Sequence, residues 1–426
     1  MRLEAESFPR LNSRGDFTVQ AVVRFGDVSA TALVPSGASK GTREALEIPV
    51  HQALSSFREI SEAIADLDIC DQERIDQTMI ELDGTEDKSR LGANAILAVS
   101  LAVARVAAEY EREPLFKYLA EMYGEKKPTL LPTPMMNVIN GGVHANNSLK
   151  FQEFMIVPMG AQNFNQAVRI GSEVYKTLGG LIQVAGVGDE GGYSPTITPR
   201  DQLGQINVVL DTLFAAIRKS GYKPGKDISP ALDPAASEFY KDGVYELSDD
   251  DSLRITHVFM TEIYKSLVGR YNIVSIEDGL AEDDRLGWWH LTKNLGDSVQ
   301  LVGDDLFVTN PRLIKEGLQE GLANAVLIKL NQIGTLTETF EAIRVARRFG
   351  AKVIISHRSG ETEDTFIADL AVATRAGQIK TGAPARGERT AKYNRLLDIE
   401  QIELPRLGFE PEFAGVSPYT NFRDGI

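Results

Sequence analysis

Residues 325–357 read AVLIKLNQIGTLTETFEAIRVARRFGAKVIISH, and this stretch contains the pattern on which the fold prediction rests. Two short apolar runs, 325–328 and 353–355, each end at polar residues, and the amphipathic segment 336–349 lies between them. Short, continuous apolar runs are typical of parallel strands buried on both faces, and the segment between them has the length of a helix. The stretch therefore predicts one strand–helix–strand unit.

The same unit recurs along the second half of the chain. Its apolar runs end at residues that are acids first and bases afterwards: Asp233, Glu277, Asp304, Lys329, His357 and Lys380. From Glu277 onward these polar ends lie 27, 25, 28 and 23 residues apart, the length of one strand, one helix and two loops. This rhythm favours an α/β fold in the form of a β/α barrel, with a doubly wound open sheet as the alternative. In a barrel, these polar ends would all meet at one mouth.

The N-terminal part of the chain has a different pattern. Residues 18–25 and 29–34 are rich in β-branched and apolar residues, and Gly26-Asp27 between them is typical of a hairpin turn. An amphipathic helix is predicted from apolar residues at helical spacing, namely Ile96, Val99, Val103 and Val106. The predicted domains are an α+β capping domain over 1–125, a proline-containing linker over 126–134 and the barrel over 135–426.

The composition limits the classes of function. The chain has 426 residues, 43% of them hydrophobic and 25% charged, which is ordinary for a soluble globular protein of two domains. Its formal net charge of −15 opposes binding to nucleic acids and to anionic membranes, so the expected partner is a small molecule. The acidic N-terminus is not expected to be a signal peptide, and the single cysteine excludes an intrachain disulfide. We therefore expect a cytoplasmic enzyme in which Cys70 is a small buried apolar side chain.

The acids at the strand ends suggest a metal site. Unpaired, Asp233, Glu277 and Asp304 would repel one another, and Mg²⁺ takes such oxygen ligands while leaving positions open to a substrate. Salt bridges to lysine or arginine are the other explanation of these acids. Lys329 would lie beside the metal, where desolvation and cationic charge both lower a lysine pKa and make the neutral amine available as a base.

Cationic residues at the same mouth suggest anion binding. Arg358, Ser359 and Lys380 offer a clamp for a phosphate or a carboxylate, because a guanidinium can bind two oxyanion oxygens at once. His357, taken alone, is better explained as a hydrogen-bonded structural histidine.

A glycine-rich motif at 186–191 matches G-x-G-x-x-G, the pattern of dinucleotide-binding sites. Such a site needs a helix that starts at the motif, but Gly192 and Pro195 follow here and make a helix unfavourable. The dinucleotide site is therefore excluded. What remains is an acidic loop suited to presenting Glu190 as a general acid.

Several longer motifs resemble those of the enolase family along the whole chain. They are VPSGAS at 34–39, which resembles the family's mobile loop, LGANA at 91–95, MMNVINGGVHA at 135–145, QEFM at 152–155, GDEGG at 188–192, SIED at 275–278, KLNQIG at 329–334 and SHRSGET at 356–362. The resemblance implies an enolase-type β/α barrel with an N-terminal α+β domain. It also implies a carbon–oxygen lyase of the phosphopyruvate hydratase type, which interconverts 2-phosphoglycerate and phosphoenolpyruvate in glycolysis and gluconeogenesis.

The resemblance further implies catalytic roles. It gives Lys329 as the base that takes the proton beside the carboxylate and Glu190 as the acid that assists loss of the hydroxyl. Glu153 would be the partner of Glu190, and two carboxylates so close would share a proton.

Metal ligands, substrate contacts and assembly are implied in the same way. Two Mg²⁺ ions per active site would be held, the first by Asp233, Glu277 and Asp304 and the second by Ser39 of the mobile loop. Substrate contacts are implied at His144, Gln152, His357, Arg358, Ser359 and Lys380. A homodimer or an octamer is the implied assembly, because Arg14 resembles an interface position.

The chain departs from the family pattern in loops and at its end. The departures are Lys40 in place of a threonine, a shortened segment after Glu47, Pro234 after Asp233, a short loop at 248–252 and an unmatched tail after Leu404. They leave a second reading open, an enolase-like paralogue on a modified substrate, such as carboxyphosphonoenolpyruvate synthase of phosphinate natural-product biosynthesis. A non-catalytic binding protein is a third class, and the intact acid, base and metal positions argue against it.

Overall fold

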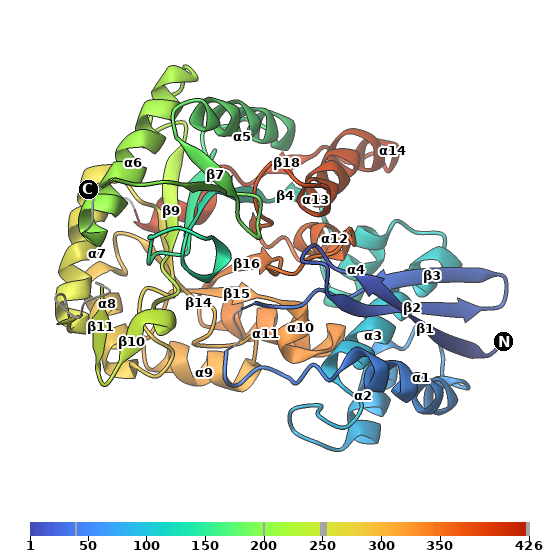
Figure 1. The fold of residues 1–426 in the computed structure, drawn as a ribbon. Coiled ribbons are helices and arrows are strands. Elements are labelled where there is room, and N and C mark those ends of the chain that lie inside the picture. The colour runs from blue at the N-terminus through green and yellow to red at the C-terminus, as the bar shows by residue number, and fades with distance from the viewer. Residues whose placement is uncertain (39–40, 199–200, 248–253, 423–426) are drawn as a thin grey trace.

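The computed structural model describes residues 1–38, 41–198, 201–247 and 254–422. Ser39, Lys40, the short loop predicted at 248–252 and the last four residues of the tail lie outside the described residues. A domain of sheet and helices, blue in Figure 1, lies beside a larger barrel. The predicted architecture, a β/α barrel with an N-terminal α+β domain, is confirmed.

A three-stranded antiparallel sheet opens the N-terminal domain. Its strands pair in chain order: β1 (Leu3–Leu11), β2 (Phe17–Phe25) and β3 (Val28–Leu33). The predicted hairpin joins β2 to β3, and Gly26 in its turn has φ +61°, a conformation that costs glycine little because it has no side chain. β1 was not predicted, because a proline and charged residues interrupt its apolar pattern.

Helices pack against this sheet and against one another. They are α1 (Val50–Ile64), α2 (Gln72–Asp83), α3 (Ala93–Tyr110) and α4 (Leu115–Tyr123). The predicted helix is α3, which packs on β2 and β3 with all its predicted apolar positions buried. Its length and hydropathy would also suit a membrane span, but 83% of it is buried, as expected for the core helix of this domain.

The barrel closes through eight strands of the described chain. Their order around the barrel is β5 (Thr133–Asn140), β6 (Glu153–Val157), β9 (Ser229–Asp233), β13 (Ser275–Glu277), β14 (Gln300–Gly303), β15 (Ala325–Ile328), β16 (Lys352–Ser356) and β17 (Gln378–Lys380). Pairing of β17 with β5 completes the ring, which excludes the open-sheet alternative. Every pairing is parallel except those of β6, which runs antiparallel to both neighbours.

Helices surround the barrel on its outside (Figure 1). They are α5 (Phe164–Gly179), α6 (Gln202–Lys219), α7 (His257–Tyr271), α8 (Arg285–Leu295), α9 (Pro311–Gln319), α11 (Leu336–Arg348), α12 (Phe366–Ala373) and α13 (Gly387–Asp398). Inside the barrel, Met135, Met155, Leu327 and Tyr419 belong to one buried apolar cluster. The barrel interior is therefore a packed core, and chemistry is confined to its ends.

Smaller elements complete the chain. They are β4 (Leu130–Leu131) paired with β18 (Glu412–Phe413), the hairpin of β7 (Val184–Val187) and β8 (Tyr193–Pro195), the strands β10 (Tyr240–Lys241), β11 (Val244–Glu246) and β12 (Arg254–Ile255), the helices α10 (Leu330–Ile333) and α14 (Leu404–Arg406), and the short turns of helix η1 (Gly142–His144), η2 (Ala236–Phe239), η3 (Ile399–Glu403) and η4 (Ser417–Phe422). The β7–β8 hairpin stands where a dinucleotide site would need a helix, in agreement with the exclusion of that site.

The prediction that Cys70 is buried is wrong. The residue lies in the turn between α1 and α2, where the chain crosses the surface, and its side chain is exposed. Partial burial together with the neighbouring Glu111 and Asp68 raises the pKa of the Cys70 thiol to about 11. The thiol is therefore protonated at neutral pH and is a poor nucleophile.

A buried carboxylate joins the two domains. Asp76 on α2 is fully buried and accepts hydrogen bonds from Gln72 Nε2 at 2.9 Å, Thr337 N at 3.0 Å and Thr337 Oγ1 at 2.7 Å. Thr337 lies in the first turn of the barrel helix α11, so the carboxylate satisfies a free backbone N–H there. Burial raises the pKa of Asp76 to about 6, although these hydrogen bonds lower it.

We expect Asp76 to make folding stability depend on pH. Because its pKa rises from 3.8 to about 6 on folding, its contribution is fully present below pH 3.8 and is lost as pH rises through about 6. Relative to Asp76→Asn, the wild-type free energy of unfolding should fall by roughly 2 kcal/mol between pH 4 and pH 7. Urea denaturation at several pH values measures this difference. The control Glu73→Gln, on the exposed side of α2, should show the same pH dependence of the free energy of unfolding as the wild-type protein. If the difference between the wild-type protein and Asp76→Asn does not change with pH, the assignment to Asp76 is wrong.

Candidate active site

The mouth of the barrel is a pocket lined mainly by charged and polar side chains. Its lining includes His144, Gln152, Glu153, Glu190, Asp233, Asp304, Lys329, His357, Arg358, Ser359 and Lys380. Glu277 contacts Lys380 of this lining. The structure therefore brings together every predicted site residue except Ser39, which lies outside the described residues.

Lys380, at the end of β17, stands at the centre of the acids. Its Nζ lies 2.8 Å from Glu277 Oε1, 3.0 Å from Asp233 Oδ2 and 3.1 Å from Glu153 Oε1. Burial alone would lower the pKa of Lys380, but these carboxylates raise it by more, so the pKa lies well above its ordinary value. Lys380 is therefore a fixed positive charge, and the predicted alternative of salt bridges explains part of the acid cluster.

Lys329, after β15, contacts Asp304, after β14. The Lys329 ammonium donates to Asp304 Oδ2, and Gln332 Nε2 donates to Asp304 Oδ1 at 2.9 Å. Burial lowers the pKa of Lys329, but Asp304 raises it and the balance lies above its ordinary value. In the protein alone the pKa of Lys329 is therefore raised, because the acid expected to bind a cation pairs with the lysine, and the lowering expected beside a bound metal stays a prediction.

The three predicted metal ligands suit a hard cation. Asp233, Glu277 and Asp304 come from the adjacent strands β9, β13 and β14, and Glu277 Oε2 is buried with no hydrogen-bond partner in the part of the chain that the structure describes. Burial and the charge of Asp233 raise the pKa of Glu277 well above its ordinary value, although Lys380 lowers it. A divalent cation would satisfy the free oxygen and relieve this repulsion.

Two further clusters have the geometry of metal ligands. Asp278, Asp304 and Asp305 place carboxylate oxygens within 4.8 Å of one another, and so do the ligand atoms of His144, Glu153 and Glu190. Asp278 accepts the backbone N–H groups of Asp304 and Asp305, each at 2.9 Å, which fixes the turn after β14.

Glu153 and Glu190 form a buried carboxylate pair. Glu153 is the first residue of β6 and lies opposite Asp233 in register, because β6 runs antiparallel to β9. Burial and the charge of Glu190 raise the pKa of Glu153 well above its ordinary value, although Lys380 lowers it. Burial also raises the pKa of Glu190, but His357, His144 and Lys380 bring it well below its ordinary value. The opposite directions of the two shifts favour one proton on the pair, on the Glu153 side, and the predicted sharing of a proton stays a prediction.

The N-terminal domain forms one wall of the site. Glu44 accepts two hydrogen bonds from the Arg358 guanidinium, at 2.9 and 3.1 Å, and Asn331 Oδ1 accepts a third at 3.1 Å. Ala38 N donates to Ser359 Oγ at 2.7 Å, which docks the predicted mobile loop on the barrel. Two residues of the barrel predicted to bind an anion, Arg358 and Ser359, are thus contacted by the other domain.

Sequence reasoning missed several residues of the site. Glu44 holds Arg358, Asn137 Nδ2 donates to Glu190 Oε2 at 3.0 Å, and Arg389 contacts His357 Nδ1 at 2.6 Å. Asp305 could have been predicted from the sequence, because it follows Asp304 directly at a strand end. The other three act through contacts between distant segments and leave no local signal.

Two family models match the chain. The one described as Enolase, N-terminal domain, matches residues 6–119, and the one described as Enolase, C-terminal TIM barrel domain, matches residues 128–421. Both matches agree with the sheet-and-helix domain and the barrel seen in the structure, and they support a hydro-lyase of the enolase superfamily. Since the two models together span nearly the whole chain, this protein belongs to the enolase family.

Proposed function

We propose that this protein is a Mg²⁺-dependent hydro-lyase that interconverts 2-phosphoglycerate and phosphoenolpyruvate. The observation that carries the proposal is that the pocket has two parts. One part holds an amine beside acids, and the other holds a pair of carboxylates. Lys329 contacts Asp304 in one part, and Glu190 lies with Glu153 in the other. Such a pocket can remove a proton next to a carboxylate and protonate a departing hydroxyl.

Each described side chain has a distinct task in this reaction. Lys329 Nζ takes the proton from the carbon beside the carboxylate. The Glu190–Glu153 pair supplies a proton to the leaving hydroxyl, and Glu153 holds that proton beforehand. Arg358 and Ser359 bind the phosphate, with Arg358 held in place by Glu44.

Mg²⁺ fits the donors at the mouth. Asp233, Glu277 and Asp304 would hold the first ion, and Ser39 together with substrate oxygens would hold the second. When bound, Mg²⁺ would supply charge that neutralises the carboxylate dianion formed by proton removal and would offset the effect of Asp304 on the Lys329 pKa.

The proposal also includes a cytoplasmic location, which the composition favours. A role in glycolysis and gluconeogenesis and assembly into a homodimer or an octamer are implied by the family resemblance.

We expect Lys329→Ala to abolish turnover of 2-phosphoglycerate. Removing the base should lower kcat by about a hundred- to ten-thousand-fold, because this is the usual contribution of one acid–base residue. Ultraviolet absorbance of the enol phosphate product follows the reaction in the presence of Mg²⁺. Lys315→Ala, an exposed lysine of α9, is the matched control and should turn over at the wild-type rate.

Absence of turnover by the wild-type protein, with folding intact, would contradict the proposal. Carboxylated and phosphonate analogues of the substrate would then be tested, because the shortened segment after Glu47 closely follows Glu44, which contacts Arg358 of the pocket. Turnover of an analogue but not of 2-phosphoglycerate would assign the chain to the paralogue with a modified substrate.

We expect Glu277→Gln to weaken Mg²⁺ binding by about tenfold or more, because affinity of such sites follows the number of ligand charges. Calorimetric titration measures the dissociation constant without substrate. Mg²⁺ should also raise the Tm of the wild-type protein more than that of the variant. Glu316→Gln, exposed on α9, controls for the loss of one acid elsewhere, and equal Mg²⁺ affinities of the two variants would exclude Glu277 as a ligand.

A further inference from the structure

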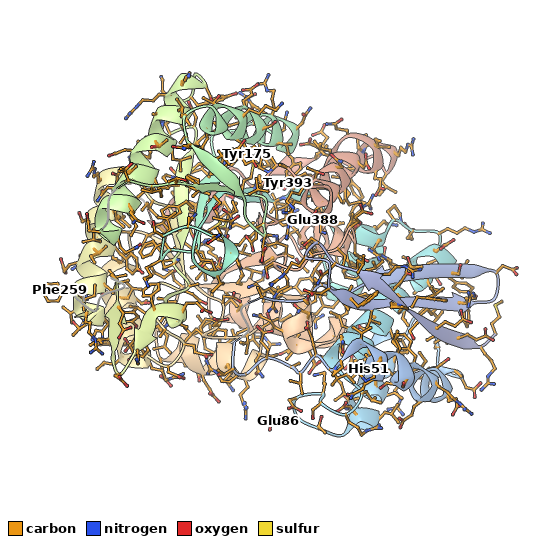
Figure 2. All side chains as sticks on the ribbon, viewed as in Figure 1. His51, Glu86, Tyr175, Phe259, Glu388 and Tyr393 are labelled. Atoms are coloured by element: carbon orange, nitrogen blue, oxygen red, sulfur yellow. The ribbon has the colours of Figure 1, made fainter. Side chains whose placement is uncertain are left out.

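Arg389 is a fully buried guanidinium for which the proposed reaction has no role. It lies in the first turn of α13, between Glu388 and Tyr393, which are labelled in Figure 2. Its Nη1 lies 2.6 Å from His357 Nδ1 and donates to the carbonyl of Arg358 at 2.6 Å. Its Nη2 donates to the carbonyls of Ser359, at 2.6 Å, and Asp189, at 2.9 Å. One side chain thus touches both the anion-binding loop and the loop that carries Glu190.

The contact with His357 fixes where that imidazole holds its proton. A guanidinium only donates hydrogen bonds, so His357 Nδ1 must be the acceptor and cannot carry a hydrogen. The single proton of the neutral ring is then on Nε2. That atom lies 3.3 Å from Glu190 Oε2, on the side of the reacting groups.

We propose that Arg389 is a positioning residue that holds His357 as the neutral tautomer with its proton on Nε2, the ring nitrogen on the side of Glu190. The assignment of an effect on catalysis rests on the proposed function, whereas the tautomer itself rests on the contact alone. The Nε2–H of a neutral His357, 3.3 Å from Glu190 Oε2, would favour negative charge on that carboxylate.

The charges around His357 agree with a neutral ring. Burial lowers the pKa of His357 to about 3, and the adjacent Arg389 and Lys380 act in the same direction, although Glu190 raises it. Protonation would also place a hydrogen on Nδ1, facing the guanidinium N–H at 2.6 Å. The geometry and the charges therefore both oppose an imidazolium.

The backbone beside Arg389 leaves no room for a side chain at position 382. Gly382 has φ +82°, and a Cβ there would lie 2.8 Å from Arg389 Cδ and 2.9 Å from the carbonyl oxygen of Glu190. That carbonyl accepts from Ala383 N at 2.9 Å, and Tyr393 Oη donates to the Gly382 carbonyl at 2.7 Å. A glycine at this position lets the arginine stem and the Glu190 loop pack directly on the same turn.

A structural role alone would also explain a buried arginine, so the test must separate the two. In Arg389→Met the donor to Nδ1 is lost, whereas Arg389→Lys keeps a donor that can reach the same atom. Arg395→Met is the matched control. Arg395 also lies on α13 and pairs with Asp369 and Glu403, away from the pocket.

The measurement is the ring ¹⁵N NMR spectrum of protein labelled at histidine, with the His357 signals assigned by their loss in His357→Gln. In the wild-type protein and in Arg389→Lys we expect one neutral tautomer, with Nε2 protonated and Nδ1 bare, from pH 5 to pH 8. In Arg389→Met we expect both tautomers, and protonation of the ring within this range. Arg395→Met should lower Tm and leave the wild-type ¹⁵N pattern.

Activity provides the second readout. Arg389→Met should lower kcat by about ten- to a hundred-fold with little change in KM, as for groups that orient a catalytic residue, and should lose activity toward acid pH. Arg389→Lys should recover most of kcat. If Arg389→Met keeps the wild-type ¹⁵N pattern, the proposal is wrong, whatever its activity. If the wild-type protein does not turn over 2-phosphoglycerate, the proposed function fails, and the ¹⁵N pattern still decides the assignment of the tautomer.

Discussion

A single ammonium group lies between acids from three neighbouring strands. Lys380 Nζ is within 3.1 Å of carboxylate oxygens of Glu153, Asp233 and Glu277, which come from β6, β9 and β13. Carboxylates held this close and out of water would raise one another's pKa and oppose closure of the barrel. In the ring of strands β17 lies across from β13, so the lysine spans the mouth and compensates these charges from the far side. Even so, the acids of the pocket outnumber its cations, Lys329, Arg358 and Lys380. That excess, in a chain of net charge −15, opposes the binding of an anionic substrate, and a divalent cation at this mouth would offset it.

The reversed strand β6 determines which acids can meet. In a barrel of parallel strands only the last residues of each strand reach the active mouth. Because β6 is antiparallel, its first residue, Glu153, lies at that mouth, directly opposite Asp233. The same reversal places the β7–β8 hairpin and Glu190 above the ends of the first strands, since β8 pairs with β5. The meeting of Glu153 with Glu190 is therefore a product of strand direction, and an all-parallel barrel with the same residues would place Glu153 at the opposite end.

Local patterns predicted much of the fold and of the acid–base inventory. Apolar runs that end in Asp233, Asp304 or Lys329 reveal both a strand and the residue at its mouth, because one segment contains both signals. What could not be predicted depends on pairs from distant segments. The Lys329 pKa was expected to be lowered beside a bound metal, but in the protein alone the contact with Asp304 raises it. Cys70 was expected to be buried because free cysteines usually are. It is exposed, because it lies in a turn at the surface. No local sequence pattern marks Arg389 or Glu44 as site residues. They belong to the site because they contact His357 and Arg358, which lie elsewhere in the chain.

The wall provided by the N-terminal domain makes substrate binding a property of the assembled chain. Arg358 is the proposed phosphate ligand of this mouth, and two of its hydrogen bonds go to Glu44 of the other domain. The Glu44 carboxylate would weaken the attraction between the Arg358 guanidinium and a phosphate. It also fixes the planar guanidinium in one orientation, which a bidentate contact requires. The buried Asp76–Thr337 contact and the Arg105–Asp364 ion pair, at 2.6 Å, hold the two domains in that register. The α+β domain thus forms part of the candidate site, since without it the barrel would retain its acids and bases but would lose Glu44, which orients Arg358.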